Sequence, residues 1–395
     1  MIAEERRSAD TVAFQLTARS GVRDDDGAPG ITALTSRMLG QGTVRRPSES
    51  DLLRAAAAVG GSLSRGFDVE TCQVTSVMPS READLGFDLL SDIVTNSLFD
   101  PDTLERQRGI LLQDLARRRA DPGSLIDDLY RDAIYGGHPA GRPFFGTPES
   151  AQGHGREQVR DQYERHWGAA NLVLTVVGRI SVEQTLEKAR QYFGGLRPGT
   201  RNQRVAVPPP PLTSTRTVRG AAGRQQVTFR LGYQAPPLTS DDRYPMIVLN
   251  FIMTGSSGRL FEEVRNQRGL AYVAGSAYSA VTDAGTWFAT AGVDPENLDA
   301  ALAVVRDEIA RLRDDLTPAE EHARAISQIA GGQIPADETN AARAGRLSSQ
   351  EVLGTPTTEE LVRRIRLVTP ADVQRVARTY FDPARSLLAV VEPSA

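Results

Sequence analysis

Two related segments that lie 214 residues apart constrain the fold of this chain more than any other feature of the sequence. Residues 159–178 and 373–392 each predict a helix, a short break and then a buried strand, and Trp167 of the first copy aligns with Phe381 of the second. When the same helix–strand unit occurs twice at a constant spacing, the chain contains two copies of one structural repeat. The sequence therefore predicts two homologous domains.

A proline-rich segment separates the two copies. Residues 207–212 contain four successive prolines, which favour an extended backbone and cannot donate hydrogen bonds to a sheet. A chain of 395 residues is also too long for a single hydrophobic core. We therefore predict an N-terminal domain over residues 1–206, a linker over 207–212 and a C-terminal domain over 213–395.

The same order of elements is predicted in both halves: a strand, a polar turn, two helices, two further strands and then a block of helices. Mostly antiparallel sheets with helices packed on them are expected, so the fold class is α+β, with two homologous α/β-sandwich domains. The first-half elements are strand 11–18, helices 30–41 and 48–59, and strands within 62–78; their second-half counterparts are strand 226–233, helices 243–254 and 258–268, and strands within 270–293.

Composition excludes several classes of function. The formal net charge of −4 gives no general attraction to nucleic acid. The single cysteine, Cys72, excludes an intrachain disulfide framework. No apolar run approaches the roughly 20 residues of a membrane-spanning helix.

The histidines do not form a recognisable metal or catalytic motif. No two of them lie within one helical turn, and the sequence has no His-x-x-x-His or Cys-x-x-Cys pair. His138 falls in a turn-rich segment, where we expect it to cap backbone groups. A Ser–His–Asp triad stays open as an alternative, although no Gly-x-Ser-x-Gly elbow supports it. The four histidines are His138, His154, His166 and His322.

Residues 258–272 predict a helix that ends at Gly269 and continues directly into a strand. Glycine favours this position because it adopts a left-handed conformation at little cost. A helix–glycine–strand elbow can bring Arg265, near the helix end, close to Tyr272, near the strand start. From the spacing alone, a helix-end arginine that solvates carbonyl groups and a packed tyrosine remain the alternative interpretation.

Three segments together resemble the pitrilysin–insulinase family of zinc peptidases, in the two-domain form of mitochondrial processing peptidase subunits and their bacterial relatives. Residues 30–43 resemble the first-helix segment of that family, residues 108–114 its ligand helix and residues 138–147 the loop that follows. The resemblance covers essentially the whole chain. It implies a fold of two homologous α/β domains and a peptidase-like function.

The zinc motif of the family is altered in this chain. The resemblance places the first zinc histidine at Ala33, the catalytic glutamate at Ser36, the second histidine at Arg37 and the third ligand at Asp114. Alanine and serine cannot replace an imidazole and a carboxylate base, and arginine places a permanent cation where zinc would sit. We therefore expect no zinc in this chain and an Arg37–Asp114 ion pair at these positions.

The second half keeps the other residues that the resemblance makes functional. Family members use an arginine and a tyrosine seven residues apart to contact substrate held at the zinc of another domain, and Arg265 and Tyr272 match this spacing. The resemblance implies the non-zinc subunit of a bacterial heterodimeric endopeptidase. The sequence leaves the compartment open between the bacterial cytoplasm and the periplasm. Its partner would be a homologous subunit that binds zinc through His-x-x-Glu-His, and its substrates would be unfolded peptides held as an added strand in a closed chamber.

Two other functions stay open at this stage. A catalytically inert structural or peptide-binding member of the same fold would keep the two domains and lose the chemistry. An independent hydrolase with a new site is the other candidate, although no nucleophile–base pair is visible in the sequence.

Overall fold

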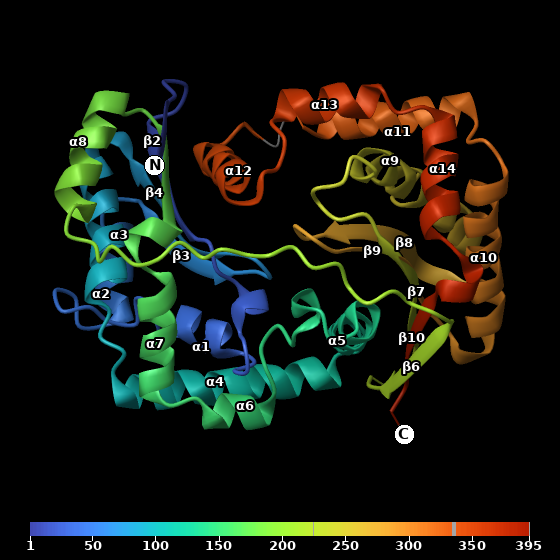
Figure 1. Ribbon diagram of the computed structural model, residues 1–395, viewed down its shortest axis with the longest axis horizontal. Helices are drawn as coiled ribbons and strands as arrows, with labels where there is room; N and C mark the ends of the chain where they lie inside the picture. Colours follow the sequence, from blue (N-terminus) through green and yellow to red (C-terminus); the bar gives the residue numbers. More distant parts are fainter. Residues whose placement is uncertain (224, 334–336, 395) are drawn as a thin grey trace. The chain divides into compact units, whose positions relative to one another are not determined.

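Two five-stranded mixed sheets with the same topology form the framework of the protein (Figure 1). The computed structural model describes residues 1–223, 225–333 and 337–394. Each sheet has one parallel pair at one edge and is otherwise antiparallel, which agrees with the predicted class. In spatial order the first sheet contains β1 (Ile2–Glu5), β5 (Leu172–Gly178), β2 (Thr11–Ala18), β4 (Cys72–Pro79) and β3 (Ser62–Phe67); the second contains β6 (Arg216–Ala221), β10 (Leu387–Glu392), β7 (Val227–Ala235), β9 (Gly285–Val293) and β8 (Ala271–Ala280).

Helices accompany the strands in both halves of the described chain, with eight in the first half and six in the second. Their N-termini carry ordinary signals: Ser48 and Thr369, for example, each form a capping box with an aspartate three residues on. The helices of the first half are α1 (Ile31–Met38), α2 (Glu49–Ala57), α3 (Ala83–Asn96), α4 (Pro101–Ala120), α5 (Pro122–Tyr135), α6 (Pro148–Gly153), α7 (Arg156–His166) and α8 (Val182–Phe193). Those of the second half are α9 (Arg243–Met253), α10 (Leu298–Asp314), α11 (Ala319–Gly332), α12 (Asn340–Leu353), α13 (Thr358–Arg366) and α14 (Pro370–Tyr380).

Helix α12, from the second half of the sequence, covers one face of the first sheet. Ala344 packs with Ala13 and Val177 of the sheet, and the hydroxyls of Ser348 and Thr17 lie 2.7 Å apart. The opposite face carries the main core of this unit, to which α1, α3 and α7 contribute. Because both faces are covered, β2 is buried along almost its whole length.

Helix α5, from the first half of the sequence, covers the second sheet in the same way. The hydroxyl of Tyr130 lies 2.6 Å from Oγ1 of Thr286, and the Tyr130 ring packs edge-on against Phe288 at 5.1 Å between centroids. Burial raises the pKa of the Tyr130 phenol far above its usual value. The two corresponding helices, α5 and α12, are therefore exchanged between the two halves of the chain.

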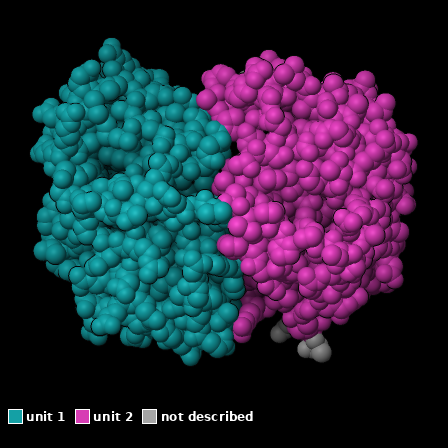
Figure 2. All heavy atoms as spheres, in the orientation of Figure 1, with its two compact units in different colours: residues 1–115, 142–205, 335–355 teal, residues 116–141, 206–334, 356–395 magenta. Residues whose placement is uncertain are grey.

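The compact units consequently differ from the contiguous domains 1–206 and 213–395 that the sequence predicts. One unit comprises residues 1–115, 142–205 and 335–355, and the other comprises 116–141, 206–334 and 356–395 (Figure 2). The break near residue 206 coincides with the predicted linker, whereas the exchanged helical segments do not follow the order of the sequence. The physical reason is that a sheet face needs apolar cover, whichever part of the chain provides it.

The linker residues 207–212 form neither helix nor strand, and they are tied to the second unit. His138 Nε2 lies 2.7 Å from the carbonyl oxygen of Val207, and the backbone N–H of Ala140 donates to His138 Nδ1 at 3.1 Å. The amide of Gln234 donates to the carbonyl of Pro210 at 2.7 Å. The expectation that His138 caps backbone groups is thus confirmed.

Strands β1 and β6 were not predicted from the sequence. They are short and carry polar residues, and β1 is half-buried while β6 is largely exposed, so neither shows the apolar alternation that marks longer strands. Each pairs parallel with the closing strand of its half, β5 or β10. None of the helices in the described part of the chain combines the length and apolarity that a bilayer crossing requires.

Replacing Gly232 with alanine is expected to destabilise the protein by about 1–3 kcal/mol, because an added methyl group overpacks a tight contact. A Cβ at this position on β7 would collide with the hydroxyl of Tyr130 and the carbonyl oxygen of Trp287. The free energy of unfolding from urea titration measures the effect. Gly66→Ala is the matched control, since a Cβ there would lie 3.5 Å from the side chain of Gln73. Equal stability of both variants would contradict a close approach of α5 to β7.

Candidate functional site

A short π-helical segment, η5 (Phe261–Asn266), carries the arginine of the candidate site. Leu260 and Val264 anchor the segment in the core of the second unit, with 1% and 0% of their surfaces exposed. The π-helix ends at Asn266, before the predicted end at Gly269, but Gly269 has the expected left-handed conformation with a φ of +63°, and its N–H donates to the carbonyl of Arg265 at 2.9 Å. Single π-helical turns are uncommon and occur frequently at functional sites.

Tyr272 lies in a β-bulge at the start of the edge strand β8. Ala271 pairs with Val293 and Val273 with Gly292, so that Tyr272 is the extra residue of the bulge. Bulges redirect side chains, and they are frequent beside active sites. Here 72% of the Tyr272 surface is exposed, so this residue is not the packed tyrosine of the alternative interpretation.

The Arg265 guanidinium lies between two aromatic rings. Its central carbon is 4.6 Å from the centroid of the Tyr272 ring and 4.7 Å from that of Phe261. Cation–π contacts of this kind contribute about 0.5–1 kcal/mol each at exposed positions. The structure thus brings Arg265 and Tyr272 together, as the helix–glycine–strand elbow predicts.

The Arg265 guanidinium and the Tyr272 hydroxyl make no hydrogen bond to the described residues. Among the described residues, none accepts a hydrogen bond from the Arg265 guanidinium or pairs with the Tyr272 hydroxyl. The nearby Arg268 behaves differently, because its guanidinium pairs with the Glu263 carboxylate and carbonyl. Arg265 is therefore a fixed cation with unused donors, not a helix-end arginine that solvates carbonyl groups.

In the first unit, Arg37 and Asp114 form the ion pair that the sequence predicts. Arg37 Nη2 lies 2.5 Å from Asp114 Oδ2, and both side chains are mostly buried. Helix α1 carries Arg37 together with Ala33 and Ser36, whose surfaces are 0% and 6% exposed, and α4 carries Asp114. The Nε of Arg37 is buried and lacks a hydrogen-bond partner among the residues described.

The donors at these four positions do not fit zinc. Protein zinc sites use thiolate, imidazole and carboxylate ligands, with at least three from the protein in catalytic sites. Ala33 offers no donor, Ser36 offers a neutral hydroxyl, and the single carboxylate of Asp114 already faces a guanidinium. Over the described ranges, no group of three or more histidine, cysteine, aspartate or glutamate side chains could hold a metal ion.

Asp25 is a buried carboxylate that the sequence analysis did not single out. It is 1% exposed and supports the start of α1 by accepting from the backbone N–H groups of Gly30 at 2.9 Å and Thr32 at 3.2 Å. Burial raises the pKa of this carboxyl to about 7, although its hydrogen bonds oppose the shift. The sequence predicts a polar turn between strand 11–18 and helix 30–41. Aspartates in such turns often accept hydrogen bonds from nearby backbone N–H groups, and this preference is the sequence signal that points to Asp25.

Comparison with known proteins identifies the family of this chain. Residues 1–148 match the model of the insulinase family, peptidase family M16, and residues 155–329 match the model of the peptidase M16 inactive domain. An uncharacterized zinc protease of Streptomyces coelicolor is 30% identical over 406 aligned residues, which cover all of this chain and 87% of the relative. The chain belongs to the insulinase family of peptidases.

Solved structures share the fold of this insulinase-family chain at low sequence identity. The peptidase M16 inactive domain from Pseudomonas fluorescens superposes with a TM-score of 0.92 at 20% identity and covers 100% of this chain and 95% of that one. A protease from Helicobacter pylori superposes with a TM-score of 0.91 at 16% identity, over 98% and 95% of the two chains. Arg265 and Tyr272 fall in the part that matches the inactive-domain model, and Arg37 and Asp114 fall in the part that matches the insulinase model.

Proposed function

We propose that this chain is the non-zinc subunit of a heterodimeric zinc endopeptidase, in which Arg265 and Tyr272 contact the carbonyl group of a peptide held at the partner's zinc. The observation that carries the proposal is the Arg265 guanidinium, which lies between the rings of Phe261 and Tyr272 with all its donors unused among the described residues. A purely structural arginine in this position would be expected to bond to nearby carbonyl or carboxylate groups.

The chemistry of amide hydrolysis explains why two such donors are useful. Attack on the carbonyl carbon moves negative charge onto the former carbonyl oxygen, and donors already aimed at that oxygen stabilise the charge. The guanidinium supplies a positive charge and N–H donors, while the phenol supplies an O–H donor. Their rigid placement at an elbow avoids reorganisation during the reaction.

The zinc and the general base are assigned to the partner subunit. In this chain the corresponding positions contain Ala33, Ser36 and the Arg37–Asp114 ion pair, which cannot hold zinc together or activate a water molecule. We infer that the partner is a homologous chain with an intact His-x-x-Glu-His helix. The substrate is an unfolded peptide, which can add as a strand to a sheet edge such as β8.

A second candidate is a catalytically inert structural or peptide-binding member of the family. The altered residues of the first half favour it, as does the match of the second half to a domain described as inactive. The two candidates differ in whether the unused donors of the second unit affect the rate of peptide cleavage.

The experiment pairs this chain with a zinc-binding homologue of the same organism and measures cleavage of a fluorogenic peptide by the purified heterodimer. Tyr272→Phe is expected to lower kcat by about tenfold or more, since it removes one donor to the developing oxyanion. Tyr278→Phe is the matched control on the same strand, because its hydroxyl donates to the carbonyl of Pro236 at 2.7 Å. Unchanged kcat for Tyr272→Phe in an intact heterodimer would favour the inert member.

A further inference from the structure

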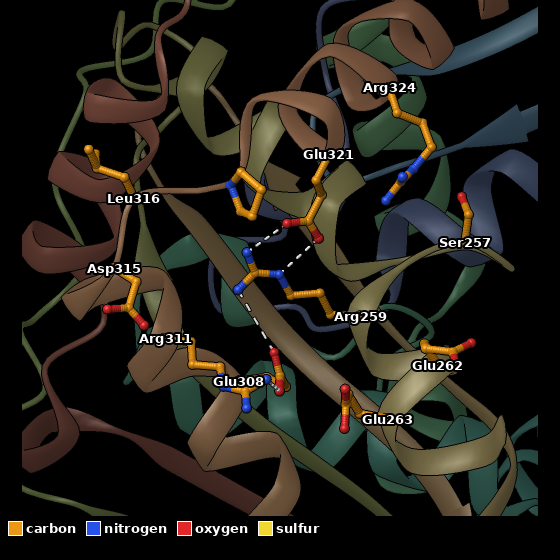
Figure 3. A pocket seen from close by; sticks show the side chains of 11 residues that line it. Ser257, Arg259, Glu262, Glu263, Glu308, Arg311, Asp315, Leu316, Glu321 and Arg324 are labelled. Atoms are coloured by element: carbon orange, nitrogen blue, oxygen red, sulfur yellow. Dashed lines mark hydrogen bonds and ion pairs between the residues drawn. The ribbon is translucent and has the colours of Figure 1, made fainter. Parts of the chain in front are cut away.

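A charged cavity of about 380 Å³ lies behind the η5 segment in the second unit (Figure 3). Its walls come from η5 and the residues before it, from α10, from the loop between α10 and α11, and from the start of α11. Five carboxylates and three guanidiniums line it, and one of the carboxylates, Glu263, already pairs with Arg268 outside the lining, so that negative charge is in excess by one. The carboxylates belong to Glu262, Glu263, Glu308, Asp315 and Glu321, and the guanidiniums to Arg259, Arg311 and Arg324.

Two of the guanidiniums are already engaged with carboxylates. Arg259 binds Glu321 through two parallel hydrogen bonds of 2.9 and 2.7 Å, and Figure 3 shows it between Glu321 and Glu308. Arg311 Nη1 donates to Glu308 Oε1 at 2.8 Å. These contacts engage Arg259 and Arg311, whereas Arg324, at an exposed position, pairs with no carboxylate among the described residues.

The second oxygen of Glu308 is the unsatisfied group of the cavity. Only 3% of Glu308 is exposed, yet Oε2 has no hydrogen-bond partner among the described residues. Its distance to Arg259 Nη1 is 3.8 Å, which is too long for a hydrogen bond. Burial raises the pKa of this carboxyl, and the opposing effects of Arg311 and Arg259 do not cancel the shift. A buried acceptor of this kind is costly unless a donor satisfies it.

We propose that the cavity is a binding site for the guanidinium or primary ammonium group of a basic side chain or small amine, with Glu308 Oε2 as its acceptor. The carboxylates of Asp315 and Glu262 at exposed positions attract a cation to the opening. Leu316 and Pro318 provide an apolar wall for an aliphatic stem. A metal ion is the less suitable occupant, because no three of the potential metal ligands in the described part of the chain lie in an arrangement that could hold one.

The test is a calorimetric titration of the full-length chain with methylguanidinium, with the blocked peptide acetyl-Ala-Arg-Ala-amide, and with its neutral citrulline analogue. We expect saturable binding of the two cations and at least tenfold weaker binding of the citrulline peptide, because a charge-assisted hydrogen bond is lost. If the arginine peptide binds at least tenfold more tightly than methylguanidinium, the source of the cation is a peptide side chain. Equal affinities identify a small amine as the source.

Glu308→Gln is expected to weaken cation binding at least tenfold. Asp307→Asn is the matched control, since Asp307 is the exposed neighbour on α10 and does not line the cavity. Asp315→Asn, at an exposed position in the lining, should weaken cation binding severalfold. This second variant tests the assignment if Glu308→Gln does not fold. Absence of saturable binding, or equal affinity of the wild type and both cavity variants, would overturn the assignment. The titration needs no partner subunit, so its outcome is separate from that of the peptidase proposal.

Discussion

Replacement of Arg265 with alanine in the heterodimer is expected to lower kcat for peptide cleavage by about 100- to 1000-fold, the usual effect of removing one oxyanion donor. The loss should appear mainly in kcat, because the charge that the guanidinium stabilises develops only in the transition state. The measurement is steady-state cleavage of a fluorogenic peptide by the purified heterodimer, with its assembly checked by size-exclusion chromatography. Arg265 lies on a segment anchored by Leu260 and Val264, so the fold should tolerate the change.

Arg268→Ala is the matched control for this prediction. Arg268 lies three residues further along, is exposed and pairs with Glu263, so its loss removes the same charge without removing an unused donor. We expect kcat within about twofold of the wild type, since exposed ion pairs contribute little. Similar rates for Arg265→Ala and the wild type in an intact heterodimer would refute the catalytic assignment.

Restoring the family's zinc residues is expected to change the metal content from none to about one zinc per chain, because three protein ligands suffice for a catalytic zinc site. The variant carries Ala33→His, Ser36→Glu, Arg37→His and Asp114→Glu. Zinc in the purified, dialysed protein is measured by atomic emission. A cost in stability of about 1–3 kcal/mol is expected, since Ala33 is completely buried and a larger side chain overpacks its site.

A triple variant that retains Arg37 is the control for the restored site. It carries the same new carboxylates and one new histidine, but keeps a permanent cation beside residue 114 and lacks the second imidazole. It should retain no zinc after dialysis. Stoichiometric zinc in the wild-type chain would disprove the proposal that the metal belongs to the partner subunit.

Much of the local structure could be predicted from the sequence. Strand 11–18 matches β2 residue for residue, and the left-handed glycine expected at Gly269 is present, although the helical segment before it ends at Asn266. The ion pair between Arg37 and Asp114 also follows from the sequence, once the resemblance places these residues on neighbouring helices. The strand follows from hydrophobic periodicity and the glycine from its backbone preference, both of which act between residues close in sequence. The ion pair follows from opposite charges at two positions that the resemblance places on neighbouring helices.

Other features depend on partners that no local pattern identifies. The short strands β1 and β6 are polar and acquire strand structure from pairing with β5 and β10. The bulge at Tyr272 exists only with respect to the register of β9, and η5 is π-helical where the sequence predicts an ordinary helix. The cavity at Glu308 collects residues from three separate elements.

The two-fold repetition, the class of fold and the elbow between Arg265 and Tyr272 are encoded in local patterns of the sequence, and the altered zinc positions are predicted from its resemblance to the family. The exchange of α5 and α12 between the two units, and the position of the Arg265 guanidinium between two rings with its donors unused among the described residues, became visible only in the folded chain. The physical reason is that side-chain periodicity records which face of an element is apolar, but not which sheet will cover that face. Which helix packs on which sheet, and which side chains then touch, depends on the shape and polarity of surfaces that form only when distant segments of the chain come together.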